Sequence, residues 1–139
     1  MSNQKKGIFW ALISLLIMGS IFGFSSQTSQ ESSSLSLQFA KWLMPFIDLD
    51  VAHFLIRKLA HFSIYALLGF SIYRSLSFFF ERKPSIFLIC MMIVVLYASL
   101  DEFHQLFVVG RSGEFRDVCI DSCGGFLGSY FSFWLKKWI

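Results

Sequence analysis

Charged residues are scarce in this sequence: they make up 15% of its 139 residues, against 55% hydrophobic residues. So low a charge content lies outside the usual range of soluble proteins, and the length suits one domain. The chain also holds eighteen phenylalanines, which a soluble core of this size could hardly bury. A bilayer accepts such side chains on every outward helix face. The composition therefore predicts a membrane protein whose surroundings are a lipid bilayer.

The small net charge and the few cysteines give no indication of a nucleic-acid site or a zinc site. The formal net charge is only +3 and does not indicate a nucleic-acid partner, because in a membrane protein the placement of charges carries the information. Cysteine is rare: Cys90 stands in an apolar run, and Cys119 and Cys123 are one helical turn apart. Nothing near them completes a zinc site, so we expect three small buried apolar residues.

The N-terminus lacks a signal-peptide cleavage site. Lys5 and Lys6 precede an apolar stretch, as they would in a signal peptide, but the stretch is longer than an h-region usually is. No A-x-A-like sequence precedes "FSSQ". We therefore expect the first apolar run to be retained as a membrane helix.

Four runs are long enough to cross a hydrocarbon core of about 30 Å, which needs roughly 20 helical residues. The predicted spans are residues 7–24, 58–80, 85–105 and 117–136. The fold class that they predict is all-α, a polytopic membrane protein with four transmembrane helices.

Four spans place both termini on one side of the membrane. That side would hold seven Lys and Arg residues and one acidic residue, whereas the other would hold five and eight. By the positive-inside rule both termini should lie in the cytoplasm, with residues 25–57 and 103–117 outside.

The segment between the first two spans has two parts. The Ser-rich piece "SSQTSQESSSLSLQ" is typical of a mobile connector. The following "FAKWLMPFIDLDVAHFLI" mixes aromatic and charged residues, as an interfacial or re-entrant helix does. An interfacial helix and a plain loop both remain open for this second part.

Polar residues recur at helical spacing near the outer ends of three spans. Arg57, His61 and Tyr65 follow one another at intervals of four, as do Asp101 and Gln105. Asp117 and Asp121 repeat the interval in the last span. Ionisable groups at this depth normally face the bundle interior or a wet cavity. We therefore expect a polar pocket that opens outwards.

Charge pairing should hold this pocket together. We expect the basic residues Arg57, Lys58 and Arg111 to pair with the acidic residues Asp101, Glu102, Asp117 and Asp121. For Lys58 we favour the simpler role of an anchor that reaches for the interface. Asp121 lies inside an apolar helix and needs a partner.

Glycines mark two close approaches. Gly124 and Gly128 form a G-x-x-x-G on the last span, which lets another backbone come near. Gly110 and Gly113 flank "RS" in the outer loop, where a tight turn would present Arg111. A guanidinium group fits a carboxylate or a phosphate in a bidentate manner. The loop thus indicates an anionic ligand, such as a lipid phosphate.

Four separated blocks resemble the VanZ-like family of small bacterial membrane proteins, named after a teicoplanin-resistance protein. They are "FSSQ", "RKLAHFSIYALLG", "YASLDEFHQLFVVGRSGEFRD" and "DVCIDSCGGFLG". Their order and spacing fit the family over most of the chain, and no polar position departs from it. The resemblance implies a single VanZ-like domain over residues 1–139, in the bacterial cytoplasmic membrane, that can lower susceptibility to lipoglycopeptides.

Three interpretations of the polar site stay open. In the first, Arg57 and Arg111 bind an anionic lipid or a lipid-linked cell-wall intermediate. The catalytic candidates are Asp101, Glu102, Asp117 and Asp121 as general base or metal ligand, with His61 and Tyr65 as proton relay. Lys58, Gln105, Ser25 and Gln27 are further candidates for ligand binding. A hard divalent cation such as Mg²⁺ would suit the carboxylate oxygens. The motif segments of known membrane lipid phosphatases are absent from the sequence, which argues against an enzyme, and the sequence leaves an enzymatic role open.

In the second interpretation the same Arg and Asp groups form alternating ion pairs while a lipid or proton passes. Four helices without a visible inverted repeat would then require a homo-oligomer. In the third, the ion pairs only fix the bundle, and function lies in contacts with a partner protein.

Overall fold

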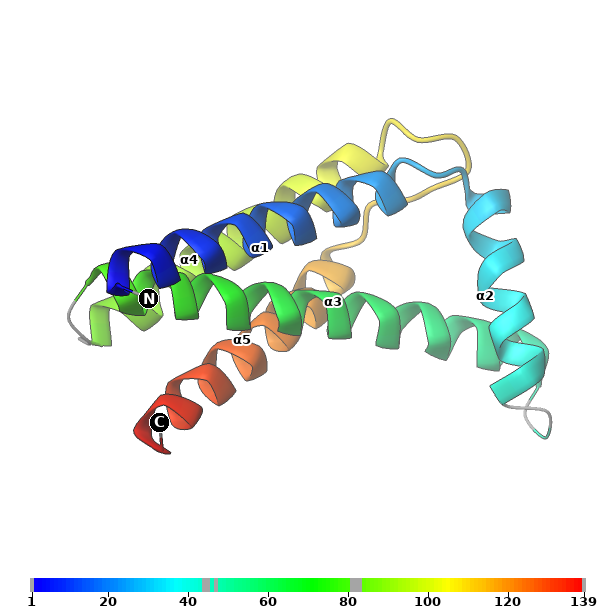
Figure 1. Ribbon diagram of the computed structural model, residues 1–139. Coiled ribbons are helices and arrows are strands. Elements are labelled where there is room, and N and C mark those ends of the chain that lie inside the picture. Colours follow the sequence, from blue (N-terminus) through cyan, green and yellow to red (C-terminus); the bar gives the residue numbers. More distant parts are fainter. Residues whose placement is uncertain (1, 44–45, 47, 81–83, 139) are drawn as a thin grey trace.

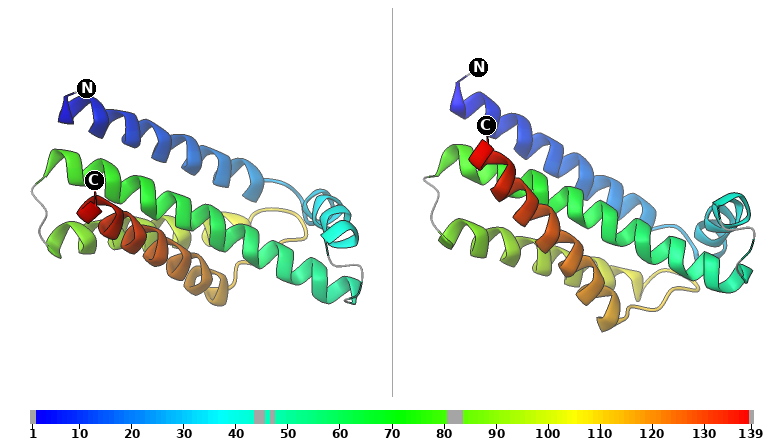
Figure 2. Two further views of the ribbon diagram at one scale, coloured as in Figure 1. Left: turned by 60° about the horizontal axis from the view of Figure 1, so that its bottom comes forward. Right: turned by 90° about the horizontal axis from the view of Figure 1, so that it is seen from below.

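Five helices make up the computed structural model, which describes residues 2–43, 46, 48–80 and 84–138. They are α1 (Asn3–Ser25), α2 (Ser29–Leu43), α3 (Leu49–Phe79), α4 (Pro84–Gln105) and α5 (Phe115–Trp138) (Figure 1). No strand occurs in the part of the chain that is described. The two ends of the chain lie at the same end of the bundle (Figure 2).

The four predicted long helices are confirmed as helices, with one clear change of boundary. α3 begins nine residues before the predicted position 58, because the Asp48 side chain accepts hydrogen bonds from the backbone N–H groups of Asp50 and Val51, at 3.0 and 3.3 Å. Such an N-cap satisfies donors that the first turn leaves unpaired. Helices α1, α3 and α4 are long and apolar enough to cross a membrane. α5 is less apolar, so four spans remain a prediction.

The prediction of a connector in the Ser-rich segment is wrong. Residues 29–43 form α2, and this helix packs against α3. Serine has only a modest helix propensity, but Ser36 satisfies its hydroxyl by donating to the Ser32 carbonyl oxygen at 2.8 Å. The predicted interfacial segment is divided between the end of α2 and the start of α3, while positions 44, 45 and 47 lie outside the described residues.

Helix α3 occupies the centre and contacts each of the other four helices (Figure 1). Its closest neighbour is α5, and the predicted close approach at the G-x-x-x-G is confirmed. A Cβ atom on Gly124 would collide with the Phe62 carbonyl oxygen, and one on Gly128 with the Ala66 carbonyl oxygen. Backbone contacts of this kind are the usual way in which small residues join helices in lipid.

Apolar side chains cover the outside of the bundle as well as its inside. Leu16 on α1, Leu88 on α4 and Phe131 on α5 are each more than half exposed, as residues that face lipid would be. The prediction of three buried cysteines holds for Cys90 only, since Cys119 and Cys123 are exposed. These two thiols lie on a face of α5 that is not covered by another described helix.

Candidate functional site

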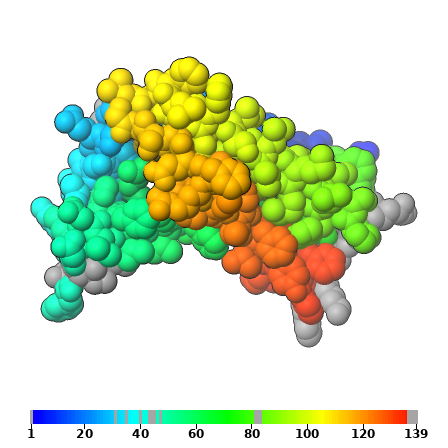
Figure 3. Space-filling view, turned by 180° about the vertical axis from the view of Figure 1, so that it is seen from behind, coloured from blue at the N-terminus to red at the C-terminus, as the bar shows by residue number. Residues whose placement is uncertain are grey.

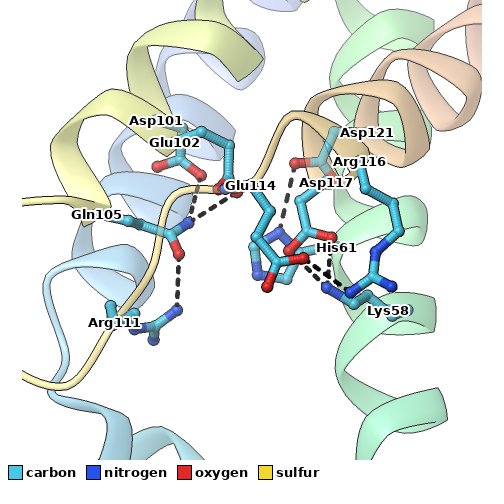
Figure 4. Close-up of polar contacts among 10 residues, drawn as sticks. All are labelled: Lys58, His61, Asp101, Glu102, Gln105, Arg111, Glu114, Arg116, Asp117 and Asp121. Carbon is cyan, nitrogen blue, oxygen red and sulfur yellow. Dashed lines mark hydrogen bonds and ion pairs between the residues drawn. The ribbon is translucent and has the colours of Figure 1, made fainter.

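The polar stripes predicted from the sequence meet at the end of the bundle away from the termini. The first half of α3, the last turns of α4 and the first turns of α5 converge there, and the loop over residues 106–114 crosses between them (Figure 4). From outside, this loop and the start of α5 lie beside the first half of α3 (Figure 3). Residues far apart in sequence therefore come within contact distance.

Four side chains form what we term the carboxylate–imidazole cluster: His61, Asp101, Glu102 and Asp121. Each offers one nitrogen or oxygen atom, and these atoms all lie within 4.8 Å of one another. Asp121 is fully buried, and its Oδ2 lies 3.4 Å from His61 Nδ1. Asp121 thus has the partner that its position required, but this partner is His61 and not one of the predicted basic residues.

Gln105 joins this cluster to the loop. Its amide nitrogen donates to Asp101 Oδ2 at 3.3 Å and to Glu102 Oε1 at 3.2 Å. Its amide oxygen accepts from Arg111 Nη1 at 3.4 Å. The other carboxylate oxygen of Glu102 accepts from the backbone N–H of Glu114 at 2.9 Å. Glutamine suits this position because it can donate and accept at the same time.

Arg111 does not pair directly with the carboxylates, so that prediction is wrong. Its Nε donates to the Gln27 carbonyl oxygen and its Nη2 to the Phe24 carbonyl oxygen, each at 3.0 Å. These carbonyls lie at the C-terminal end of α1, where a cation is favoured by the helix dipole. The turn that presents Arg111 uses Gly110, whose φ of 76° is the only positive one among the described residues.

Two of the predicted basic residues behave differently from each other. Lys58 forms an ion pair with Asp117 rather than acting as an interfacial anchor. Arg57 has no hydrogen bond or ion pair with any residue that the structure describes. Burial, and after it the positive charge of Arg57, lowers the pKa of Arg111 from its ordinary value. The positive charges of Arg57 and Arg111 therefore act on each other.

The Lys58–Asp117 pair is expected to contribute measurably to stability. Its side chains are 17% and 14% exposed, whereas those of the Arg116–Glu114 pair are 59% and 43% exposed. A double-mutant cycle with Lys58→Met and Asp117→Asn should give a coupling of at least about 1 kcal/mol, measured by SDS titration of the purified protein. The same cycle on the exposed pair should give a value near zero. Equal couplings would contradict this expectation.

Two cavities adjoin the two arginines. The larger, of about 270 Å³, has mainly apolar walls from α1, α2 and α3. It is lined by Ile21, Phe24, Ser25, Gln27, Ser32, Ser36, Phe39, Ile56, Arg57, Ala60, His61, Ile64 and Arg111. The smaller, of about 150 Å³, is polar and is lined by residues that include His53, Lys58, Ser112 and Asp117. Arg57 and Arg111 line both cavities.

The remaining residues singled out in the sequence lie in three different surroundings. Ser25 and Gln27 line the apolar cavity together with His61. Tyr65 is fully buried beneath His61 on α3, and its hydroxyl bonds to no described residue. His104 lies apart from the cluster: its Nε2 is 3.2 Å from Ser26 Oγ, and its ring packs on Phe22.

Sequence reasoning missed the wall that α2 contributes. Phe39, Ser32 and Ser36 face the apolar cavity from this helix. The serine repeat suggested a connector and concealed the helical spacing of four between Ser32 and Ser36, which was the available signal. The backbone carbonyls that hold Arg111 carry no signal in the sequence.

Comparison with known proteins agrees with the resemblance noted in the sequence. No curated protein and no solved structure matches the chain. The family model described as VanZ/LLP1 matches residues 9–136, which is nearly the whole chain. Together with its apolar helices, this match places the chain among membrane proteins. The chain belongs to the VanZ/LLP1 family.

Proposed function

We propose that this protein binds an anionic lipid or a lipid-linked cell-envelope intermediate, with the phosphate at Arg57 and Arg111. The observation that carries the proposal is that these two arginines line both an apolar and a polar cavity. An amphiphile needs this arrangement, because its acyl or prenyl chain requires apolar walls and its headgroup requires polar ones. The two cavities would receive the two parts of one ligand.

Electrostatics supports an anion at this point. The Arg57 guanidinium has no described partner, and its charge acts on Arg111. Two like charges near each other in a partly buried place repel, and an anion between them converts the repulsion into attraction. Arg111 uses three of its five N–H donors on Gln27, Phe24 and Gln105. Arg57 would therefore be the main phosphate contact, and Arg111 the second.

The placement in the cell is part of the proposal. Four spans with both termini in the cytoplasm put the site at the outer surface of the bacterial cytoplasmic membrane. Lipid-linked cell-wall intermediates are exposed there, which agrees with the resistance to lipoglycopeptides such as teicoplanin that the family resemblance implies. The carboxylate–imidazole cluster beside the arginines remains the expected place for any acid–base chemistry.

The test is binding of a polyprenyl phosphate to the purified protein, followed by native mass spectrometry and by fluorescence titration in detergent. We expect Arg57→Ala to weaken binding about tenfold to a hundredfold, as loss of a charge-assisted contact does. Arg57→Lys should weaken it less, because the charge remains and the bidentate fit is lost. The control is Lys41→Ala, a basic residue of α2 that lines neither cavity.

Two results would overturn the proposal. One is unchanged binding in a folded Arg57→Ala protein. The other is equal affinity for the unphosphorylated polyprenol, which would assign the cavity to apolar chains alone. In either case the polar site would return to the interpretation of a network that stabilises the bundle.

A further inference from the structure

We propose that His61, Asp101, Glu102 and Asp121 bind one divalent first-row metal ion, of the Mn²⁺ or Zn²⁺ class, in preference to Mg²⁺. The four residues come from three helices, α3, α4 and α5 (Figure 4). One imidazole nitrogen among carboxylate oxygens favours such an ion, whereas Mg²⁺ prefers oxygen ligands only and retains its waters. Metal binding would thus tie the three helices together at one point.

The donor atoms lie close enough together to surround a single ion. They are all within 4.8 Å of one another, and His61 Nδ1 is 3.4 Å from Asp121 Oδ2. Ligands about 2.1 Å from one ion are separated by about 3.4 Å in a tetrahedral shell and by at most about 4.2 Å in any shell. The widest pair would therefore have to close by up to about 0.6 Å if its atoms lie on opposite sides of the ion, and by up to about 1.4 Å in a tetrahedral shell.

Buried oxygen atoms without partners are a second observation that points to a ligand. Asp121 is fully buried, and its Oδ1 accepts no hydrogen bond from any described residue. The fully buried Tyr65 hydroxyl is also without a described partner, and it lies in electrostatic range of Asp101 and Asp121. Buried polar atoms are nearly always paired, so these two unpaired oxygens indicate that a ligand is bound near Asp121.

The charge balance indicates that this species is a cation. Asp101, Glu102 and Asp121 are at most 5% exposed, and His61 is the only basic residue in direct contact with them among those described. Lys58 pairs with Asp117 instead, and Arg111 reaches the carboxylates only through Gln105. Three buried carboxylates beside one imidazole are strongly unfavourable unless a cation or extra protons neutralise them.

The surroundings of the cluster resemble the outer shell of a metal site. Gln105 donates to two of the carboxylates, and the Glu114 backbone N–H donates to a third oxygen. Hydrogen bonds of this kind orient ligating carboxylates and tune their affinity. His61 also lines the apolar cavity next to Arg57, so a bound ion would stand beside the phosphate. This last role rests on the proposed function, whereas the ion site itself rests on the donor set, its unpaired buried oxygens and its charge balance.

Metal binding can be measured without any lipid. The purified protein is treated with EDTA, dialysed against Mn²⁺, Zn²⁺ or Mg²⁺, and analysed by elemental mass spectrometry and calorimetry. We expect one Mn²⁺ or Zn²⁺ per chain and affinity for Mg²⁺ at least about tenfold weaker. Asp121→Asn and His61→Gln should each weaken binding about tenfold or more. Asp50→Asn, an exposed carboxylate of the first turn of α3, serves as the control.

A spectroscopic readout keeps the test valid if Asp121→Asn fails to fold. Pulsed electron paramagnetic resonance of bound Mn²⁺ should detect coupling to an imidazole nitrogen, and His61→Gln should remove it.

Wild-type protein that binds less than one ion per two chains, or a folded Asp121→Asn protein that binds as wild type, would overturn the site. Repeating the polyprenyl phosphate titration in EDTA separates the two proposals: lipid binding without metal would leave the proposed function intact, and metal binding without lipid would leave the ion site intact.

Discussion

Replacing Gly128 with leucine is expected to prevent α5 from packing on α3 and to leave little folded protein. A Cβ atom at this position would already collide with the Ala66 carbonyl oxygen. Because the obstacle is backbone, no change of rotamer can relieve it, and the two helices would have to separate. We expect a loss of more than about 3 kcal/mol, at or beyond the upper end for overpacked cores. Yield and size-exclusion profile in detergent measure the effect.

The matched control is Gly19→Leu on α1. A Cβ atom on Gly19 would meet nothing within 4 Å, so the same added side chain should face lipid there and leave the protein folded. Equal losses for both variants would mean that leucine disturbs this chain generally and that the close approach of α3 and α5 has no special weight.

Replacing Gln105 with leucine should produce the second large effect, again on stability. The side chain is 2% exposed and contacts Asp101, Glu102 and Arg111. Leucine is of similar size but removes one hydrogen bond from each of these three partners, and each buried group that it leaves unpaired costs about 1–3 kcal/mol. We expect the midpoint of thermal unfolding in detergent to fall by well over 5 °C.

Gln38→Leu provides the comparison for this substitution, because Gln38 is exposed on α2. It should change the unfolding midpoint very little. If Gln105→Leu unfolds at the wild-type temperature, the hydrogen bonds through Gln105 do not hold the site together, and other contacts must do so.

The long helices could be predicted because each is marked by an apolar run. α2 could not, since its serines resemble a linker and its packing against α3 is not visible in the sequence. The start of α3 could not be predicted from the sequence either. Asp48 acts as an N-cap only because the chain turns at this position, and the sequence does not show that turn. Composition thus predicts which segments cross lipid, and tertiary contacts decide the structure of the segments that do not.

The site shows the same division. Helical spacing correctly grouped His61, Asp101 and Asp121, because residues four apart share a helix face. The pairing of charges was predicted only in part. Lys58 forms the expected ion pair with Asp117, whereas Arg111 donates to backbone carbonyl oxygens at the end of α1. Every residue has a carbonyl, so nothing in the sequence could mark Phe24 and Gln27 as its partners.

The length of α3 has a consequence for how a ligand arrives. Its 31 residues extend about 46 Å, and even a tilt of about 40° leaves about 35 Å to fit into a hydrocarbon core of about 30 Å. α1 and α4, with 23 and 22 residues, match that core. Because Ser75 donates to the Gly7 carbonyl oxygen at 3.0 Å, α3 is level with the start of α1 at its far end. The surplus turns therefore project at the end where α2 packs.

Arg57 lies eight residues, or about 12 Å, from the projecting tip of α3. If α1 and α4 span the hydrocarbon core, this depth is where the hydrocarbon of a leaflet gives way to its headgroups. A lipid already in the leaflet would thus bring its phosphate level with Arg57 merely by diffusing sideways. We expect capture to depend on two-dimensional concentration within the leaflet, and to be insensitive to how poorly the lipid dissolves in water.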